Sequence, residues 1–317
     1  MSTKPRIVLA GGSGFLGQAL ARHFDNLQWE VVVLSRSARA GKNSVRYVAW
    51  DGRTPDAWQQ ELEGAQAVVN LAGKSVDCRY TPANRREILA SRVDSTRVLG
   101  QTIGRCSRPP QVWLNSSTAT VYKHTFGPPW DEHGALDATA EAKDAFSVEV
   151  AQAWERALNE AETPGTRKVA LRLAMVLGHG KNSVFPVLRR LVRFGLGGPM
   201  AGGRQFVSWI HEVDYCRAVE WIIAHPEISG PVNMVAPNPL PNRDMMRILR
   251  EVCHVPLGLP AYRWMLEAGA FVLRTETELI IKSRRVVPRR LLDSGFEFEF
   301  PEIRGAFEDL VANDGTA

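Results

Sequence analysis

Hydrophobic runs and amphipathic stretches alternate along the first half of the chain. The apolar runs are short, rich in β-branched residues and typical of strands that are covered on both faces. They span residues 6–10, 31–34, 45–50, 67–71, 112–114 and 169–173. Because helical stretches separate these strands, the pattern predicts an α/β fold with a parallel, doubly wound sheet.

The intervening helices are recognised from apolar residues that recur three and four positions apart. The first covers residues 15–20, and a third spans about 145–161. Between them a long helix begins at Pro82, which suits a first helical position, with Thr81 as its cap.

After about residue 180 the pattern changes, and the elements become shorter and more mixed. It predicts a helix near 184–194, a strand at 206–210, a helix at 215–224 and a strand near 231–235 that returns to the main sheet. The last ~80 residues are predicted to be mostly helical, with the alternating aromatics of 296–300 forming one more strand. We therefore expect a first domain at residues 1–180 and a second, mostly C-terminal lobe at 181–317.

Composition and charge exclude several classes of protein. Apolar residues make up 44% of the chain and charged residues 23%, which excludes wholesale disorder. The net charge is +5, and the basic residues are dispersed apart from short clusters such as Arg284-Arg285 and Arg289-Arg290. A solvated surface is favoured over a nucleic-acid site for these residues.

The cysteines and the hydropathy pattern indicate a cytoplasmic protein without a metal site. The four cysteines are Cys78, Cys106, Cys216 and Cys253, and no two of them are close in sequence. Neither a zinc site nor a redox dithiol is therefore expected. No stretch approaches the ~18 consecutive apolar residues of a membrane span. The chain enters a strand-like segment at Arg6, without the layout of a signal peptide.

A glycine-rich turn separates the first strand from the first helix. Its spacing is G-x-x-G-x-x-G, and its members are Gly11, Gly12, Ser13, Gly14, Phe15, Leu16 and Gly17. Small residues let the backbone approach a pyrophosphate, and the helix N-terminus offers it N–H groups and partial positive charge. The turn therefore indicates a dinucleotide site, with an ordinary tight strand-to-helix turn as the alternative.

The end of the second strand indicates which dinucleotide binds. The segment is Ser35-Arg36-Ser37, where an NAD site would carry an acidic residue for the ribose 2′-hydroxyl. A guanidinium at Arg36 suits a 2′-phosphate instead, and Arg39 and Lys42 add positive charge. We expect NADP, with a solvated loop arginine as the alternative.

Together these segments resemble the extended, epimerase-like branch of the short-chain dehydrogenase/reductase superfamily. Asn70-Leu71-Ala72-Gly73 resembles the segment that lines the nicotinamide side of the cofactor, and Asp51 resembles the carboxylate that contacts adenine. The run from Ser116 to Tyr122, SSTATVY, resembles the catalytic segment of sugar-nucleotide epimerases. The resemblance places the catalytic Ser/Thr of that segment at Thr118.

Later segments narrow the resemblance to the "epimerase family protein" subgroup, atypical extended members with a distinctive C-terminal segment. These segments are Gly195–Pro199, Ser208–His211, Ala236–Pro239 and Val287–Leu291 with Gly295-Phe296. The resemblance implies a Rossmann-type, NADP-binding domain, a small C-terminal α+β lobe for the substrate, and a homodimer.

The chain departs from that superfamily at its proton-transfer residues. A Tyr-x-x-x-Lys pair normally follows the fifth strand, where the lysine lowers the pKa of the tyrosine. No tyrosine occurs between residues 135 and 165, and the two positions are occupied by Ser147 and Ala151. Lys143 is expected on the same helix, on the wrong side of the tyrosine position.

A second departure concerns the substrate. The arginine that clamps a nucleotide diphosphate in extended epimerases is replaced by Val207, and Arg204 is the nearest substitute. This change weakens the case for a sugar nucleotide.

The remaining candidates for chemistry each have a structural alternative. Thr118 would hydrogen-bond a substrate carbonyl or pack in a strand, and Tyr122 would act as a displaced acid or as a core tyrosine. His211 would be catalytic or a buried helix cap, Glu155 would face the pocket or solvent, and Asp214 would be a charge at a helix N-terminus. The glycine-rich loop 195–203 would close over a ligand or simply connect two elements.

Two functions follow from these residues. The first is an NADP-dependent oxidoreductase or epimerase-like enzyme that transfers hydride to or from an unknown small polar substrate. The alternative is a non-catalytic NADPH-binding sensor or regulatory protein, which the missing Tyr/Lys pair favours.

Overall fold

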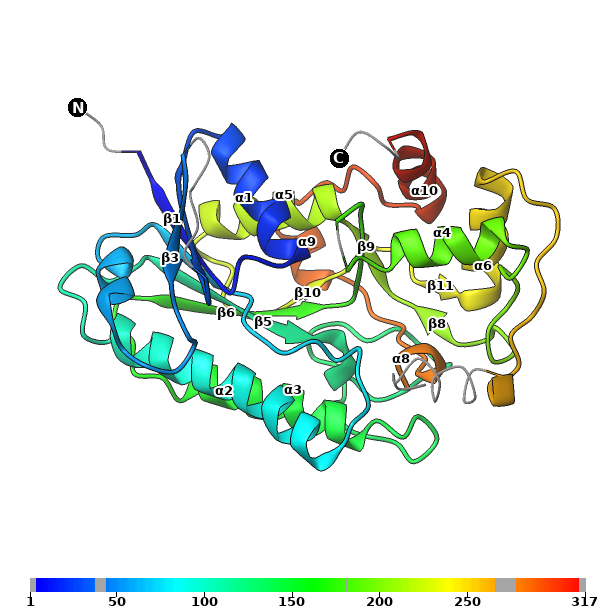
Figure 1. Cartoon of the computed structure of the whole chain (residues 1–317), viewed down its shortest axis with the longest axis horizontal. Coiled ribbons are helices and arrows are strands. Elements are labelled where there is room, and N and C mark those ends of the chain that lie inside the picture. Colours follow the sequence, from blue (N-terminus) through cyan, green and yellow to red (C-terminus); the bar gives the residue numbers. More distant parts are fainter. Residues whose placement is uncertain (1–3, 38–43, 181, 266–277, 314–317) are drawn as a thin grey trace.

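The computed structural model describes residues 4–37, 44–180, 182–265 and 278–313, and its centre is one parallel sheet (Figure 1). Seven strands lie in the order β10-β6-β5-β4-β1-β2-β3, and each neighbouring pair is parallel. Their bounds are β1 (Arg6–Ala10), β2 (Glu30–Ser35), β3 (Val45–Ala49), β4 (Ala67–Asn70), β5 (Val112–Thr118), β6 (Arg167–Leu173) and β10 (Gly230–Met234). The predicted doubly wound α/β fold is confirmed, and β10 is the strand expected near 231–235.

Helices cover both faces of this sheet, with α1 and α5 on one side and α2 and α3 on the other (Figure 1). Their bounds are α1 (Phe15–Asn26), α2 (Pro82–Ile103), α3 (Ala145–Asn159) and α5 (Glu212–Ala224), with short 3-10 turns η1 (Ala57–Leu62) and η2 (Ala119–Val121). None of the described helices combines the length and the apolar character that crossing a bilayer requires.

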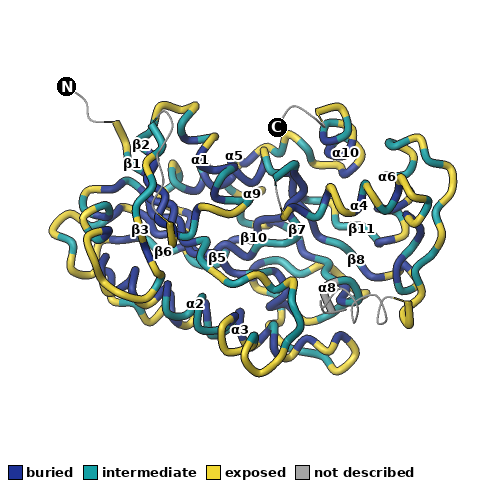
Figure 2. The backbone as a smooth tube through the Cα atoms, in the orientation of Figure 1, coloured by how far each residue is buried: buried dark blue, intermediate teal, exposed yellow. Residues whose placement is uncertain are grey.

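The side-chain alternation of the strands divides the core into two layers. In β1, Ile7 and Leu9 pack in the cluster on the α1 and α5 side, whereas Val8 and Ala10 pack in the cluster on the α2 and α3 side. All four side chains are fully buried, and Figure 2 colours residues by burial. Burial on both faces explains why the sequences of these strands are continuous apolar runs.

A further group of elements packs around its own apolar cluster beside the sheet (Figure 2). Phe185, Met246 and Phe307 are members of this cluster and are fully buried. The group contains α4 (Phe185–Arg193), α6 (Asn242–Val252), α10 (Ile303–Ala312) and the paired strands β7 (Met175–Leu177) with β9 (Trp209–His211) and β8 (Phe206–Val207) with β11 (Leu240–Pro241). The short helices α8 (Glu278–Ile281) and α9 (Arg289–Asp293) belong to the C-terminal part.

The strand predicted at 206–210 is interrupted at Ser208, which separates β8 from β9. The hydroxyl of Ser208 donates to Arg284 O and accepts from Val286 N, both at 2.9 Å. The Ser208 side chain thus makes hydrogen bonds of the kind that a neighbouring strand would make, and it joins this segment to the C-terminal part.

The prediction of a strand at 296–300 is wrong, because the backbone of this segment hydrogen-bonds to a side chain and not to another strand. The amides of Glu299 and Phe300 donate to the buried carboxylate of Asp214, both at 2.8 Å. Asp214 also accepts from Arg217 at 2.9 Å, so it is more than the helix-terminal charge that we expected. The aromatic alternation reflects separate packing sites: Phe296 lies in the main core and Phe300 against His211.

The sequence left two alternatives for His211, a catalytic residue or a buried helix cap, and the structure shows the helix cap. Its Nδ1 accepts from Val213 N at 3.2 Å at the start of α5, and its Nε2 lies 3.3 Å from Asp309 Oδ2 of α10. Burial lowers the pKa of His211 to about 4, although Asp309 and Asp214 act in the opposite direction. The side chain is therefore neutral at neutral pH, and it joins α5 to the C-terminal helix.

Replacing the carboxylate of Asp214 is expected to destabilise the chain strongly. Asp214→Ala removes the buried carboxylate that accepts from the amides of Glu299 and Phe300 and from Arg217, and we expect the free energy of unfolding to fall by about 3 kcal/mol. Urea denaturation measures this change. Asp293→Ala, which removes an exposed partner of Arg289, is the matched control and should leave the urea midpoint nearly unchanged.

The lowered pKa of His211 predicts a pH dependence of stability. Between pH 6.5, the ordinary pKa of histidine, and about 4, the unfolded chain binds a proton that the folded chain does not. Stability should therefore decrease as the pH is lowered through this window. His211→Asn keeps a capping acceptor and should show a shallower decrease in urea titrations at several pH values; equal slopes would contradict the assignment.

Candidate functional site

A cavity of about 590 Å³ opens at the carboxyl ends of the central strands. Its wall includes Gly11 after β1, Leu71 after β4, Thr118 at the end of β5 and Leu173 at the end of β6. Between β1 and β4 the strand order reverses direction along the chain, and parallel α/β sheets bind ligands at that switch point.

The glycine-rich turn forms one end of this cavity by close backbone packing. A Cβ on Gly17 would lie 2.3 Å from Gly12 Cα, so α1 can rest directly on the turn only with glycine there. Gly11 has a φ of +73°, and a Cβ on it would lie 2.7 Å from Ala72 Cα. Both glycines are therefore required for α1 to begin where it does.

The N-terminus of α1 faces this cavity without a capping side chain. Gly14 is the N-cap, it makes no side-chain hydrogen bond, and a Cβ built on it would meet no atom within 4 Å. Gly14, Phe15 and Leu16 all line the cavity. The first N–H groups of the helix therefore carry partial positive charge toward an open space that suits an anion.

A smaller cavity of about 250 Å³ is lined by Arg36 and Asp51. Asp51 Oδ1 accepts from the amides of Thr54 and Arg53, both at 2.8 Å, and these bonds lower the pKa of its carboxyl. Arg36 has no hydrogen-bond or ion-pair partner within the part of the chain that the structure describes. Arg39 and Lys42, expected to add charge here, lie outside the described residues.

Asn70 shapes the segment after β4 rather than facing the cavity. It is fully buried, donates to Asn115 Oδ1 at 2.7 Å and accepts from Ala72 N at 3.1 Å. Ala72 packs against Gly11, and Gly73 lies next to the guanidinium of Arg92.

The predicted cofactor residues thus divide into three groups. Those that line the large cavity are Gly11, Gly14, Phe15, Leu16, Gly17 and Leu71. Those that line the small cavity are Arg36 and Asp51. Those that line neither are Gly12, Ser13, Ser35, Asn70, Ala72 and Gly73.

Three hydroxyl-bearing residues of β5 line the large cavity: Ser116, Ser117 and Thr118. Ser117 Oγ donates to Glu155 Oε1 at 2.6 Å. Thr118 Oγ1 accepts from Thr120 N at 3.2 Å and lies 3.1 Å from Thr120 Oγ1. Ser116 is 5% exposed, and its hydroxyl has no hydrogen-bond partner in the described ranges. A buried hydroxyl without a partner is uncommon, and its place in the cavity wall makes a ligand its natural partner.

Tyr122 does not line the cavity, which argues against its expected role as an acid. Its hydroxyl donates to Asn233 Oδ1 and accepts from Arg172 Nη1, both at 2.7 Å. Burial raises the pKa of Tyr122 to about 12. The side chain is therefore the core tyrosine of the two alternatives.

The positions of the missing Tyr/Lys pair lie on α3 and carry no proton donor of that kind. Ser147 lines the cavity, whereas Ala151 is fully buried in the core. Lys143 was expected on this helix, but it precedes the first residue of α3 and is exposed. Glu155 neither faces the cavity nor solvent, because it forms a two-point ion pair with Arg172.

The remaining candidates lie away from the cavity. Arg204 is exposed, with its guanidinium 5.7 Å from the Phe126 ring, so it does not replace the diphosphate clamp missing at Val207. The loop 195–203 is joined to residues 259–261 by backbone hydrogen bonds, and none of its residues lines the cavity. It is a connection, not a cover, in this structure.

Several cavity residues were not recognised from the sequence. Arg284 was assigned to the solvated surface but lines the cavity, and Arg92 was given no role although it also lines it. A signal for Arg92 was present, since it lies four residues from Ile88 and from Thr96 on the buried face of α2.

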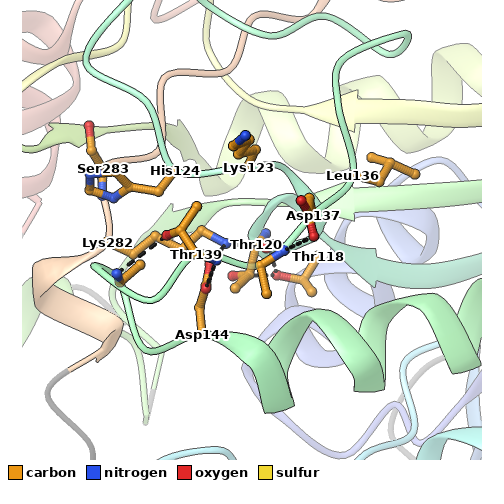
Figure 3. Close-up of polar contacts among 12 residues, drawn as sticks. Thr118, Thr120, Lys123, His124, Leu136, Asp137, Thr139, Asp144, Lys282 and Ser283 are labelled. Carbon is orange, nitrogen blue, oxygen red and sulfur yellow. Dashed lines mark hydrogen bonds and ion pairs between the residues drawn. The ribbon is translucent and has the colours of Figure 1, made fainter.

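A buried lysine fixes the segment around Arg284 to Thr120, which lines the cavity. Lys282 donates to Thr120 O at 2.5 Å and forms an ion pair with Asp144, the residue before α3 (Figure 3). Both side chains are almost completely buried. In the view of Figure 3, Thr120 lies between Lys282 and Thr118. Thr118, Thr120 and Arg284 line the cavity, so the C-terminal part contributes to its wall.

Comparison with known proteins agrees with this architecture. Residues 7–235 match the model of the NAD dependent epimerase/dehydratase family, and residues 263–310 match a domain of unknown function, DUF1731. The second match covers the distinctive C-terminal segment, including Lys282 and Arg284.

Similar proteins cover the whole chain. The epimerase family protein YfhF of Bacillus subtilis is 30% identical over 98% of this chain and 99% of its own length. The epimerase family protein SDR39U1 of Mus musculus is 30% identical over 97% of this chain and 100% of its own length. A crystal structure of human SDR39U1 with NADPH has a TM-score of 0.84 and 26% identity, and covers 97% of this chain and 99% of that one. The resemblance inferred from the motifs is confirmed, and the chain belongs to the NAD dependent epimerase/dehydratase family.

Proposed function

We propose that this protein binds NADP(H) and acts as an oxidoreductase or epimerase-like enzyme on a small polar substrate. The observation that carries this proposal is the uncapped N-terminus of α1, which opens on the large cavity at Gly14. Helix N-termini in this position hold the pyrophosphate of dinucleotides. The human relative with 26% identity, crystallised with NADPH, supports the same assignment.

Each part of the coenzyme has suitable residues. The turn at residues 11–17 would hold the pyrophosphate on backbone amides, and Ser35 and Arg36 would bind the 2′-phosphate. Asp51 lines the same small cavity as Arg36 and would contact adenine. The segment 70–73 would shape the nicotinamide side, since Leu71 lines the large cavity.

We also propose that different parts of the chain bind the coenzyme and the substrate. Residues 1–180, with β10, would bind the coenzyme, and residues 181–317 would form most of the substrate lobe. Arg284 supports this division, because it brings the C-terminal part to the wall of the cavity.

The residues that line the cavity offer hydroxyl groups for a hydride-transfer reaction but not the usual tyrosine proton donor. When bound, NADPH would supply hydride chemistry toward a substrate carbonyl carbon, and the alcohol product would also need a proton from the protein or from water. Thr118 would hold the carbonyl oxygen through its hydroxyl, since it lines the cavity at the end of β5. The tyrosine that normally delivers the proton is replaced at its position by Ser147, and Tyr122 is engaged elsewhere.

That replacement favours a second candidate function, a non-catalytic NADPH-binding sensor. Both functions place the coenzyme in the same cavity, and they differ in whether hydride leaves it.

Arg36→Glu should reverse the preference for the 2′-phosphate. We expect NADPH affinity to fall tenfold or more, about 1.4 kcal/mol, with little loss for NADH. Fluorescence titration with both coenzymes measures the difference. Arg97→Glu, an exposed charge reversal on α2 outside both cavities, is the control. Equal losses for the two coenzymes would refute the role of Arg36.

Hydride transfer distinguishes the two functions. Single turnovers with deuterated NADPH are run against a panel of carbonyl compounds and sugar nucleotides, and deuterium is sought in the products. Deuterium in any product would exclude the sensor, whereas none in any product would favour it. With an active substrate, Thr118→Val should lower the rate by about a hundredfold while coenzyme affinity is retained.

A further inference from the structure

The wall of the large cavity formed by α2, α3 and the segment after β4 is mostly apolar and aromatic. Its members include Val76, Tyr80, Ile88, Phe146 and Val150. All five also pack together, since Ile88, Phe146 and Val150 form a buried cluster against which Val76 and Tyr80 pack. Arg92 of α2 places a guanidinium in this wall.

The guanidinium of Arg92 is held in a fixed orientation. Its Nη1 donates to Lys74 O and to Ile88 O, both at 3.0 Å, which uses both protons of that nitrogen. Its central carbon lies 5.1 Å from the centre of the Trp154 ring, a cation–π distance. The edge formed by Nε and Nη2 has no hydrogen-bond partner among the residues that the structure describes.

The charge of Arg92 is also left without a carboxylate. Burial lowers its pKa to about 10, and no Asp or Glu of the described ranges forms an ion pair with it. Two other buried cations do form ion pairs with carboxylates: Arg172 pairs with Glu155, and Lys282 pairs with Asp144. A half-buried cation in a cavity wall, with a free bidentate edge, is suited to an anion that arrives with a ligand.

We propose that Arg92 anchors the carboxylate of the substrate, and that the substrate is a carbonyl compound with an apolar or aromatic body. The Nε and Nη2 edge matches the two oxygens of a carboxylate. The cluster of Ile88, Phe146 and Val150 would cover the apolar body, and Ser116 and Thr118 lie in the same cavity for polar atoms. This inference rests on the proposed function and narrows its substrate class.

An independent observation points to a ligand in this cavity. The hydroxyl of Ser116 is buried, lines the cavity and lacks a partner in the described part of the chain. A sugar nucleotide fits this wall less well, since Val207 replaces the diphosphate clamp and Arg204 lies on the exposed surface.

The test compares an acid with its neutral isostere. The protein is saturated with NADP⁺, so that no hydride is available, and 4-oxo-4-phenylbutanoate and 4-oxo-4-phenylbutanamide are titrated calorimetrically. We expect the acid to bind at least tenfold more tightly than the amide. Arg92→Met should abolish this preference, and Arg92→Lys should retain part of it, because a lysine keeps the charge and loses the bidentate edge.

Arg97→Met removes a charge from the same helix outside the cavity, and it should behave as wild type. The inference is overturned if wild type does not bind the acid, binds both compounds equally, or keeps its preference in Arg92→Met. It is also overturned if Arg92→Met lowers NADP⁺ affinity tenfold, since the guanidinium would then serve the coenzyme. Should Arg92→Met not fold, the wild-type comparison and Arg92→Lys decide. Failure of wild type to bind NADP⁺ would instead refute the proposed function.

Discussion

The architecture of the cavity depends on one close backbone contact, the packing of Gly17 on Gly12. No side chain fits between them, so α1 begins directly above the end of β1 and directs its first amides into the space beyond the sheet. Any Cβ at Gly17 would displace the helix and redirect the amides that face the cavity. The reversal of strand order between β1 and β4 then leaves room beside the helix for a ligand.

A set of hydrogen-bonded polar side chains links α3 to β6 and β10. Glu155, Arg172, Tyr122 and Asn233 form one connected set of hydrogen bonds and ion pairs beneath the cavity. Such a network fixes the packing of α3 on the sheet, because leaving any member unpaired in this buried place would be costly. It also withdraws Tyr122 from chemistry. The hydroxyl-bearing residues that line the cavity are Tyr80, Ser116, Ser117, Thr118, Thr120 and Ser147.

Local signals in the sequence predicted the framework well. The cap of α2 is Thr81, which accepts from Asn84 N at 3.2 Å, and Pro82 is its first residue, because cap chemistry depends only on neighbours. The glycine turn and the apolar strands were equally local. By contrast, the partners of Asp214 and the cavity positions of Arg92 and Arg284 depend on residues distant in sequence. Alternating phenylalanines at 296–300 therefore suggested a strand that the buried carboxylate of Asp214 prevents.

The attachment of Lys282 to Asp144 and Thr120 has a consequence for the order of biosynthesis. Every strand of the seven-stranded sheet has been synthesised once residue 234 is made, so the sheet can assemble before the C-terminal part is available. Arg284 and the lysine that fixes its segment emerge about fifty residues later. A nascent chain can thus form the glycine-rich turn and the strand ends before the Arg284 part of the cavity wall exists, and the cavity is completed only after residue 284 has been translated.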